Sequence, residues 1–369
     1  MTKLTIGLDV HSIGSEKGGN ETYYRELARG LASIRTQHHF FLYYSARSHG
    51  KRLNLDGEFS NRQFWPIHPA LRIPLSAPWC AHRDRLDVYH AQYILPPFLN
   101  CKTVVSIFDL AHERFPEFFH PIEARRSHHL IRWSARRADH VITVSRFSAQ
   151  DLEELYGVSP EKITVTHLAA GKEFRLLDAG VCTELILRKY GLSAPFILYA
   201  GRLQARKNLP RLVQAYAQLK KRGIQEKLVL VGKRDWKSDD LLEAVREQNL
   251  TSDVVFVGYV PGEDLPHFYN AASVFVFPSI FEGFGLPIVE SMACGTPTIT
   301  SQGSSLEEVA GDAAVLVDPL SVVSIANAIE KVLGSAGLRQ DLREKGLRRA
   351  SDFSYQLAAA QTVRVYENL

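Results

Sequence analysis

Two short stretches of this sequence combine charged side chains with glycines at predicted turns, a combination suited to holding an anionic ligand. The first runs from Phe281 to Glu290 and reads FEGFGLPIVE. It follows the apolar run Ser273–Ser279, which is typical of a buried strand, and Pro287 opens a helix after it. A strand, turn and helix of this kind place backbone N–H groups and the positive helix end at the carboxyl edge of a parallel sheet. The pattern therefore predicts a site for an anion or a polar ligand at that edge.

Two carboxylates flank this turn. Glu282 lies within it, and Glu290 follows on the helix, where the helical period can return its side chain toward the same side. Each acid alone has an ordinary interpretation, Glu282 as a turn residue and Glu290 as a solvated helix residue. Their combination with the glycine pair favours a binding role.

The second stretch carries cations. The apolar strand Phe196–Ala200 ends in Gly201 and Arg202, and Lys207 precedes a helix predicted over 209–219. Two fixed cations beside a glycine and ahead of a helix suit an anionic ligand such as a diphosphate. Arg206 is a candidate third cation. The alternative is that these side chains only solvate a surface loop.

Both stretches resemble motifs of a known family. The spacing of Glu282 and Glu290 is similar to the Glu-x7-Glu signature of retaining glycosyltransferases with the GT-B fold, and most closely of glycosyltransferase family 4. The run from Gly201 to Asn208 resembles the family's second signature, in which Gly-Arg precedes Lys-Asn ahead of a helix. The resemblance implies an α/β protein of two facing Rossmann-like, doubly wound domains with an interdomain cleft. It also implies a nucleoside-diphosphate-sugar donor, linked to GDP or UDP, and no other cofactor.

The amino-terminal half carries weaker counterparts of these motifs. Gly18 and Gly19 lie between a short strand and a helix predicted over 21–31, where they could let the backbone approach a diphosphate. The pattern Gly-Gly-x-Glu-x-Tyr resembles the family's loop that meets the donor phosphates and the acceptor, with Asn20 and Glu21 as further candidates. A flexible surface turn is the alternative.

Asp109 follows a strand predicted over 103–108 and matches an Asp of the family, which implies a role in orienting the acceptor. A strand-end acid that caps a turn is an equal alternative. Many family members have a His before this Asp, but the position here is Phe108, so the role of that His cannot be carried over. His112, further along the loop, is a candidate substitute.

The resemblance implies a role for each candidate. Glu290 would accept hydrogen bonds from the ribose hydroxyls, and Glu282 with the N–H groups of the turn would hold the transferred sugar. Arg202 and Lys207 would stabilise the departing diphosphate. The predicted catalytic residues are Arg202, Lys207, Glu282 and Asp109, and the predicted donor-binding residues are Gly18, Gly19, Gly201, Gly232, Val260, Gly283, Phe284, Gly285, Leu286 and Glu290.

Length and composition indicate two globular domains. The chain has 369 residues, of which 45% are hydrophobic and 23% charged, and it is too long for one core of ordinary size. We predict an acceptor domain over 1–177 and a nucleotide-sugar domain over 178–353, with the last helix, 354–369, packing back on the first domain. The proline-rich stretch 53–78 is assigned to loops with short elements.

The charge is unevenly divided. Residues 1–175 contain 23 Lys and Arg against 18 Asp and Glu, a net of +5, whereas the remainder has 21 against 22, a net of −1. A basic half suggests an anionic partner, either a membrane surface or a phosphate-bearing acceptor, and no motif indicates nucleic acid. The helix predicted over 121–140 has several arginines, which either form a solvated face or dock on a membrane.

The sequence has no apolar run of eighteen residues and opens directly on a predicted strand. We therefore expect a cytoplasmic protein, with peripheral contact at the inner face of the membrane as an extension of that expectation. The cysteines lack metal-ligand spacing and are expected to be reduced, structural thiols: Cys80, Cys101, Cys182 and Cys294.

These features together predict a retaining hexosyltransferase that moves a sugar to a hydroxyl of a saccharide or lipid-linked acceptor in polysaccharide or glycolipid assembly. Mannose is the first candidate sugar. No Asp-x-Asp motif or His/Asp cluster suggests a metal site, so we expect activity without a metal ion. The alternatives are a sugar-nucleotide epimerase on the same fold and a catalytically silent nucleotide-sugar-binding partner. A nicotinamide-dependent dehydrogenase is disfavoured because neither half has Gly-x-Gly-x-x-Gly after its first strand.

Overall fold

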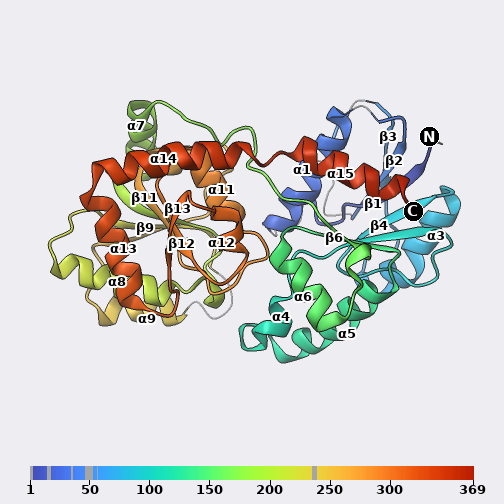
Figure 1. The fold of residues 1–369 in the computed structure, drawn as a ribbon, viewed down its shortest axis with the longest axis horizontal. Helices are drawn as coiled ribbons and strands as arrows, with labels where there is room; N and C mark the ends of the chain where they lie inside the picture. The colour runs from blue at the N-terminus through green and yellow to red at the C-terminus, as the bar shows by residue number, and fades with distance from the viewer. Residues whose placement is uncertain (1–2, 15–17, 35, 46–52, 56, 235–238) are drawn as a thin grey trace. The chain divides into compact units, whose positions relative to one another are not determined.

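The computed structural model describes residues 3–14, 18–34, 36–45, 53–55, 57–234 and 239–369. The predicted loop 15–20 therefore falls partly outside the described residues. The chain forms two compact units, one made of Met1–Leu168 with Ser354–Leu369 and the other of Ala169–Phe353. Each unit is an α/β layer structure around a parallel sheet, as the sequence predicts (Figure 1).

The sheet of the first unit has the strand order β3-β2-β1-β4-β5-β6-β7 within the described residues, and its strand pairs are parallel. The order reverses between β1 and β4, which are neighbours although far apart in sequence. The strands are β1 (Thr5–Asp9), β2 (His39–Tyr44), β3 (Phe59–Gln63), β4 (Val88–Gln92), β5 (Lys102–Ser106), β6 (His140–Thr143) and β7 (Ile163–Val165).

Helices cover both faces of this sheet, because right-handed crossovers in opposite directions place helices on opposite sides. The principal ones are α1 (Gly19–Ser33), α3 (Ala77–Arg83), α5 (Pro121–Arg137), α6 (Arg146–Tyr156) and α15 (Tyr355–Glu367). Shorter helical segments are α2 (Pro69–Leu71), a π-helical turn η2 (Arg72–Ser76), α4 (Ala111–Arg114), η3 (Pro116–Phe118) and η4 (Pro160–Lys162).

The carboxyl-terminal helix α15 belongs to the first unit. A side chain at Gly30 in α1 would meet the carbonyl oxygen of Tyr355, so the two helices pack closely there. The His90 ring lies 2.6 Å from the Tyr366 hydroxyl, and the His38 ring lies 3.0 Å from Glu367. These buried polar contacts fix α15 on the unit formed by the start of the chain.

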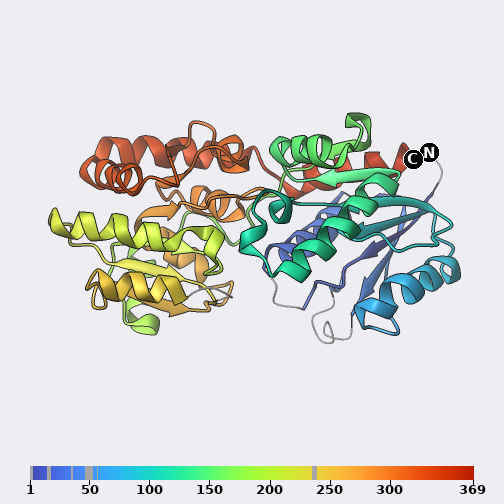
Figure 2. The same cartoon turned by 90° about the horizontal axis from the view of Figure 1, so that it is seen from below.

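The sheet of the second unit has the order β10-β9-β8-β11-β12-β13. Figure 2 shows this unit, coloured from green to red, from a second side. Its strands are β8 (Phe196–Ala200), β9 (Leu228–Val231), β10 (Val254–Gly258), β11 (Ala272–Phe277), β12 (Thr298–Ser301) and β13 (Ala314–Val317). Its helices are α7 (Ala179–Tyr190), η5 (Ala205–Lys207), α8 (Leu209–Lys221), α9 (Asp239–Glu247), α10 (Leu265–Ala271), α11 (Leu286–Ala293), α12 (Ser305–Ala310), α13 (Val322–Gly334) and α14 (Ala336–Ser351). The central strands are almost entirely apolar and buried, as expected when helices cover both faces.

The stretch 53–78 contains more regular structure than predicted. Phe59–Gln63 is an edge strand, and a continuous series of helical segments begins at Pro69. The strand was not evident in the sequence because FSNRQ is largely polar and its residues are at most partly buried, so it has no clear apolar alternation.

No helix in the described part of the chain is long and apolar enough to cross a membrane. All four cysteines are unbonded thiols, and Cys80, Cys182 and Cys294 are buried.

Candidate functional site

The two charged stretches meet at one edge of the second sheet. β8 and β11 are adjacent, but the chain leaves β8 toward β9 and leaves β11 toward β12, on opposite sides. The strand order therefore reverses between β8 and β11, and the loops after these strands separate there. Open α/β sheets bind ligands at such a switch point, outside the carboxyl ends of the strands.

Glu282 is the centre of a buried polar cluster at this edge. Its Oε1 accepts a hydrogen bond from the Lys207 ammonium and one from Ser279 Oγ at 2.6 Å, and its Oε2 accepts one from Arg206 Nη1 at 2.8 Å. The loop after β8 is thus tied to the loop after β11. Ser305, at the start of α12, donates to the Glu282 carbonyl oxygen at 2.6 Å and holds the backbone of the turn.

The electrostatics of this cluster favour the ionised carboxylate. Burial alone would raise the pKa of Glu282, but the charges of Arg206 and Lys207, with the hydrogen bonds from Lys207 and Ser279, lower it to about 2. Lys207 is itself buried, and its ammonium lies 4.8 Å from the centre of the Phe277 ring. Arg202 is exposed at the beginning of the same loop.

Two glycines allow the turns at this edge to approach one another. A Cβ at Gly232, whose φ is +144°, would lie 1.8 Å from the carbonyl oxygen of Gly201. Gly285 caps α11 in the left-handed conformation with φ of +96°, and a Cβ there would lie 2.3 Å from a methyl carbon of Leu306. Gly232 and Gly285 are therefore required by packing as well as by backbone conformation.

Glu290 lies on α11 in a different environment from Glu282. The Tyr269 hydroxyl donates to its Oε2 at 3.0 Å, and Tyr269 comes from α10. Burial raises the pKa of Glu290 to about 7, aided by the charge of Glu173 and opposed by the Tyr269 hydrogen bond. Both carboxylates of the predicted signature are buried, but the pKa of Glu282 is lowered by paired cations, whereas the pKa of Glu290 is raised by burial.

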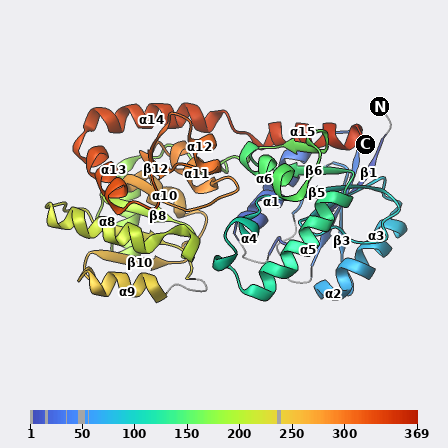
Figure 3. The same cartoon turned by 60° about the horizontal axis from the view of Figure 1, so that its bottom comes forward.

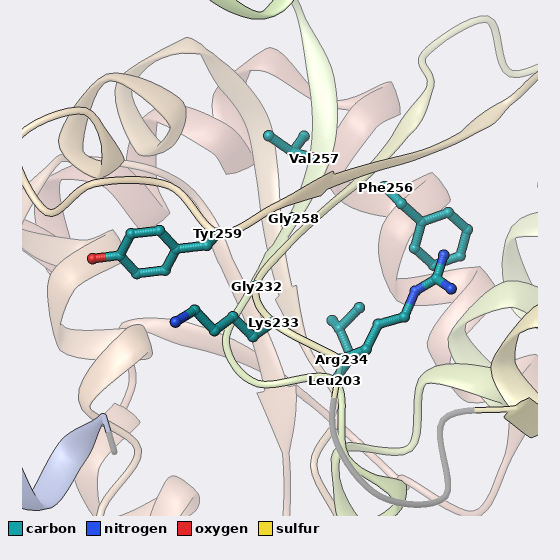
Figure 4. A pocket seen from close by; sticks show the side chains of 8 residues that line it. All are labelled: Leu203, Gly232, Lys233, Arg234, Phe256, Val257, Gly258 and Tyr259. Carbon is teal, nitrogen blue, oxygen red and sulfur yellow. The ribbon is translucent and has the colours of Figure 1, made fainter. Parts of the chain in front are cut away.

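A pocket of about 460 Å³ lies next to this edge (Figure 4). The Lys233 ammonium sits 4.7 Å from the centre of the Tyr259 ring, and the Arg234 guanidinium 5.1 Å from that of Phe256. Gly232 links the pocket to the turns described above, since its N–H donates to the Gly258 carbonyl oxygen at 2.8 Å. Its lining residues are Leu203, Gly232, Lys233, Arg234, Phe256, Val257, Gly258 and Tyr259, and the predicted residue Val260 follows them as a buried side chain.

The candidates of the first unit lie at the carboxyl edge of its own sheet. Gly18 caps α1 with φ of +74°, and Gly19 is the first residue of that helix rather than part of the loop. Asp109 Oδ1 accepts the Ala111 N–H at 3.1 Å, so it does cap the turn before α4. Phe108 packs against Tyr23 of α1 with ring centres 4.6 Å apart, which brings the two turns together.

His112 is a buried residue of α4. Its Nε2 lies 2.9 Å from the Tyr156 hydroxyl, and the same hydroxyl donates to Glu113 at 2.7 Å. Burial lowers the pKa of His112. These contacts account for the residue as part of the packing between α4 and α6.

Sequence reasoning missed several side chains that organise the site. Ser279 and Ser305 hold Glu282, and Tyr269 holds Glu290, yet none of them was singled out. Ser279 stands three residues before Glu282, which is a weak local signal. Tyr269 and Ser305 come from other helices, and no short-range pattern identifies them.

Two family models match this chain. "Glycosyltransferase Family 4" matches residues 17–169, and "Glycosyl transferases group 1" matches residues 186–349. Among curated proteins, the chain is 34% identical over 329 residues to the O-antigen chain mannosyltransferase B of Escherichia coli. That alignment covers 88% of this chain and 84% of the relative.

Solved structures share the whole fold. The sucrose-phosphate synthase of Thermosynechococcus elongatus superposes with a TM-score of 0.81 at 24% identity, covering 99% of both chains. Anabaena HepE, solved in complex with UDP and glucose, superposes with a TM-score of 0.78 at 18% identity, covering 99% of this chain and 100% of that one. The GT-B architecture expected from the sequence motifs is therefore confirmed.

Proposed function

Because this chain belongs to glycosyltransferase family 4, and is thus a glycosyltransferase using a nucleotide-sugar donor and a saccharide acceptor, we propose that it is a retaining mannosyltransferase of polysaccharide or glycolipid assembly. The observation that carries the proposal is the buried cluster of Glu282 with Lys207 and Arg206 at the switch point. The name of the 34% identical relative supports mannose and an O-antigen-like product. The same relative gives no support to an epimerase or to a silent binding partner.

The cations of the loop after β8 would neutralise the donor diphosphate. Arg206 and Lys207 carry two positive charges against one on Glu282, which leaves a net charge of about +1 at the cluster. Arg202 adds a further positive charge at the beginning of the same loop. The leaving diphosphate gains negative charge as its bond to the sugar breaks, so cations already held in place favour the transition state. Because these cations would stabilise the leaving diphosphate, we further propose that the chain is active without a divalent cation. An assay in the presence of a chelator tests this proposal.

The remaining contacts of the donor are assigned to the loop after β11 and to α11. Glu290 would accept hydrogen bonds from two ribose hydroxyls, which requires the ionised carboxylate. The transferred sugar would contact Glu282 and the turn formed by Gly283, Phe284, Gly285 and Leu286. Gly201, Gly232 and Val260 would border the nucleotide, and the pocket beside them would receive its base, from either GDP or UDP.

Retention does not require a covalent intermediate in this proposal. Retaining glycosidases place two carboxylates about 5 Å apart on the sugar, whereas here Glu282 is ion-paired and Glu290 lies against Tyr269. The acceptor hydroxyl would attack from the face that the diphosphate leaves, and the diphosphate would take its proton. Asp109 would orient the acceptor, with Gly18 and Gly19 near the donor phosphates, and a lipid-linked acceptor would bring the basic first unit into peripheral contact with a membrane.

The test is donor binding and slow donor hydrolysis across a panel of nucleoside-diphosphate sugars, with Glu290→Ala and Lys207→Ala as comparisons. We expect one donor to bind and to be hydrolysed by the parent chain, and both variants to lose at least about tenfold in hydrolysis. Transfer from that donor to a saccharide acceptor, with the anomeric configuration of the product read by NMR, tests retention. Conversion of the donor to another sugar nucleotide without acceptor would instead establish an epimerase, and binding without any turnover a silent partner.

A further inference from the structure

The first unit carries an unusual concentration of exposed, large apolar side chains. Trp65 is 81% exposed, Leu75 58% and Trp79 56%, and they lie within one run of fifteen residues. The surfaces of soluble proteins normally carry such residues singly, so a cluster of this kind indicates a surface that binds an apolar partner, either a protein or a membrane. We define this cluster, the outer stripe, as the exposed side chains Trp65, Ile67, Leu71, Leu75 and Trp79.

The outer stripe is held rigidly by the opposite side of the same helical segment. Arg72 is buried and forms an ion pair with Asp9 at 2.8 Å, and Ser76 Oγ accepts the Trp65 N–H at 3.0 Å. Cys80 is buried in the core of the unit. Residues 72, 76 and 80 therefore point inward, whereas residues 71, 75 and 79, also four apart, follow one another along the outside. The exposed apolar side chains of the outer stripe therefore belong to a segment whose opposite side is packed against the unit.

A second helix on the same side of the sheet has a related outer face. Residues of α3 and α5 contribute to one hydrophobic core against the sheet, and Figure 3 shows α2, α3 and α5 along the side of this unit opposite α15. On α5 the exposed positions combine apolar Ile122, Leu130 and Trp133 with arginines. Helix α5, for which the sequence allowed either a solvated or a membrane-docking face, therefore lies on the same side of the sheet as the outer stripe.

The charge of this face points to an anionic partner. Residues 61–87 and 121–140 together contain nine arginines and no lysine against four acids. Arg72 is buried and paired with Asp9, and the other eight arginines leave a net charge of +4. The Arg83 guanidinium lies over the Trp79 ring at 4.7 Å from its centre, an arrangement that keeps the cation at the rim of the apolar surface. Tryptophan and arginine beside aliphatic side chains suit the boundary between lipid headgroups and acyl chains.

We propose that the outer stripe docks this protein on an anionic lipid bilayer, with Trp65, Leu75 and Trp79 entering the headgroup region. This inference rests on the proposed function, because a lipid-linked acceptor is the reason for a transferase to work at a bilayer surface. It adds a defined surface, 65–79, to the general expectation from a basic half. The arginines of α5 supply long-range attraction, and the outer stripe supplies the apolar contact.

Vesicle partitioning of the full chain tests the proposal. The probe is a set of vesicles of phosphatidylglycerol with phosphatidylethanolamine, compared with vesicles of phosphatidylcholine alone. We expect partitioning to the anionic vesicles, and the variant Trp65→Ser/Leu75→Ser/Trp79→Ser to reduce it by at least about tenfold. The matched control is Leu357→Ser, which removes an apolar side chain of 53% exposure from α15 on the other side of the unit and should leave partitioning unchanged.

Two further measurements separate the alternatives. Transfer to a water-soluble acceptor should be the same in the triple variant and the parent chain, since the stripe is not part of the donor site. If the variant partitions like the parent, the proposal is overturned, whatever the transferase assay shows. If sedimentation shows that the variant instead converts a dimer to a monomer, with partitioning unchanged, the stripe is a protein interface and the proposal is again wrong.

Discussion

Replacing Glu282 by glutamine is the sharpest perturbation that the site offers, because the change keeps the shape of the side chain. It removes the negative charge and replaces one acceptor oxygen by an N–H donor. The pKa of Glu282 is about 2 in the folded chain against an ordinary value of 4.5. At 1.36 kcal/mol for each pKa unit, the ionised carboxylate contributes about 3 kcal/mol to the free energy of unfolding at neutral pH. Glu282→Gln should lose an amount of this order and also leave the buried Lys207 unpaired.

The pH dependence has a defined sign. A carboxylate with a lowered pKa contributes its full stability above the unfolded value of about 4.5, and the contribution disappears as the pH falls toward about 2. The difference in stability between the parent chain and Glu282→Gln should therefore be constant from pH 8 to 5 and shrink steadily below pH 4.5. Amide hydrogen exchange of peptides from α8 and α11, measured in mild denaturant, reports the second unit without assuming two-state unfolding of the whole chain.

Two comparison variants make this result interpretable. Glu330 pairs with Arg222 at 2.6 Å, but the side chains are 44% and 36% exposed, so water screens the pair and Glu330→Gln should cost less than about 1 kcal/mol. Lys207→Met combined with Glu282→Gln removes both buried partners, and its cost should be smaller than the sum of the single costs by 1 kcal/mol or more. A loss below about 1 kcal/mol for Glu282→Gln, with no dependence on pH, would refute the reasoning.

Two other predictions concern Glu290 and Gly232. With a pKa of about 7, Glu290 is mostly protonated at pH 6, so the affinity for a nucleoside-diphosphate sugar should rise by up to about tenfold from pH 6 to 8, and Glu290→Gln should flatten that rise. Because its folded pKa is raised, the free energy of unfolding should fall as the pH increases from 5 through 7, and this fall should also vanish in the variant. Gly232→Ala forces a carbon atom against a backbone oxygen and should lower the melting temperature by several degrees and abolish donor binding, whereas Gly262→Ala, with nothing within 4 Å, should do neither.

The parts of the site that the sequence predicted are those built by neighbours along the chain. The strand, glycine turn and helix around Gly285 follow from an apolar run, a positive φ and a proline, all within a few residues. The ion pairs of Glu282 could not be predicted in the same way, since Arg206 and Lys207 are 76 and 75 residues away. Their meeting depends on β8 and β11 being neighbours at the switch point, which is a property of the sheet order.

The same distinction explains the errors in the first unit. Edge strand β3 lacks the buried alternation that identifies a strand, so the sequence left it within a proline-rich loop. The four prolines of the stretch 53–78 led to its assignment as a loop, so the helical segment that begins at Pro69 was not predicted. The apolar residues of the outer stripe also have a spacing that is typical of a buried core. Only the structure shows that Leu75 and Trp79 face outward while Cys80 packs inward.

The hydrogen bonds of Glu282 limit what this residue can do for a sugar. A carboxylate offers about four lone-pair positions to donors, and Lys207, Ser279 and Arg206 occupy three of them. At most about one further hydroxyl can bind there without breaking an existing contact. In the proposed mechanism, Glu282 would therefore act first as the residue that fixes the cations before the diphosphate binds. Sugar recognition would then depend more heavily on the backbone of the turn from Gly283 to Gly285. Charge stabilisation that is arranged in advance in this way requires little reorganisation during the reaction, which is the condition under which electrostatic catalysis is strongest.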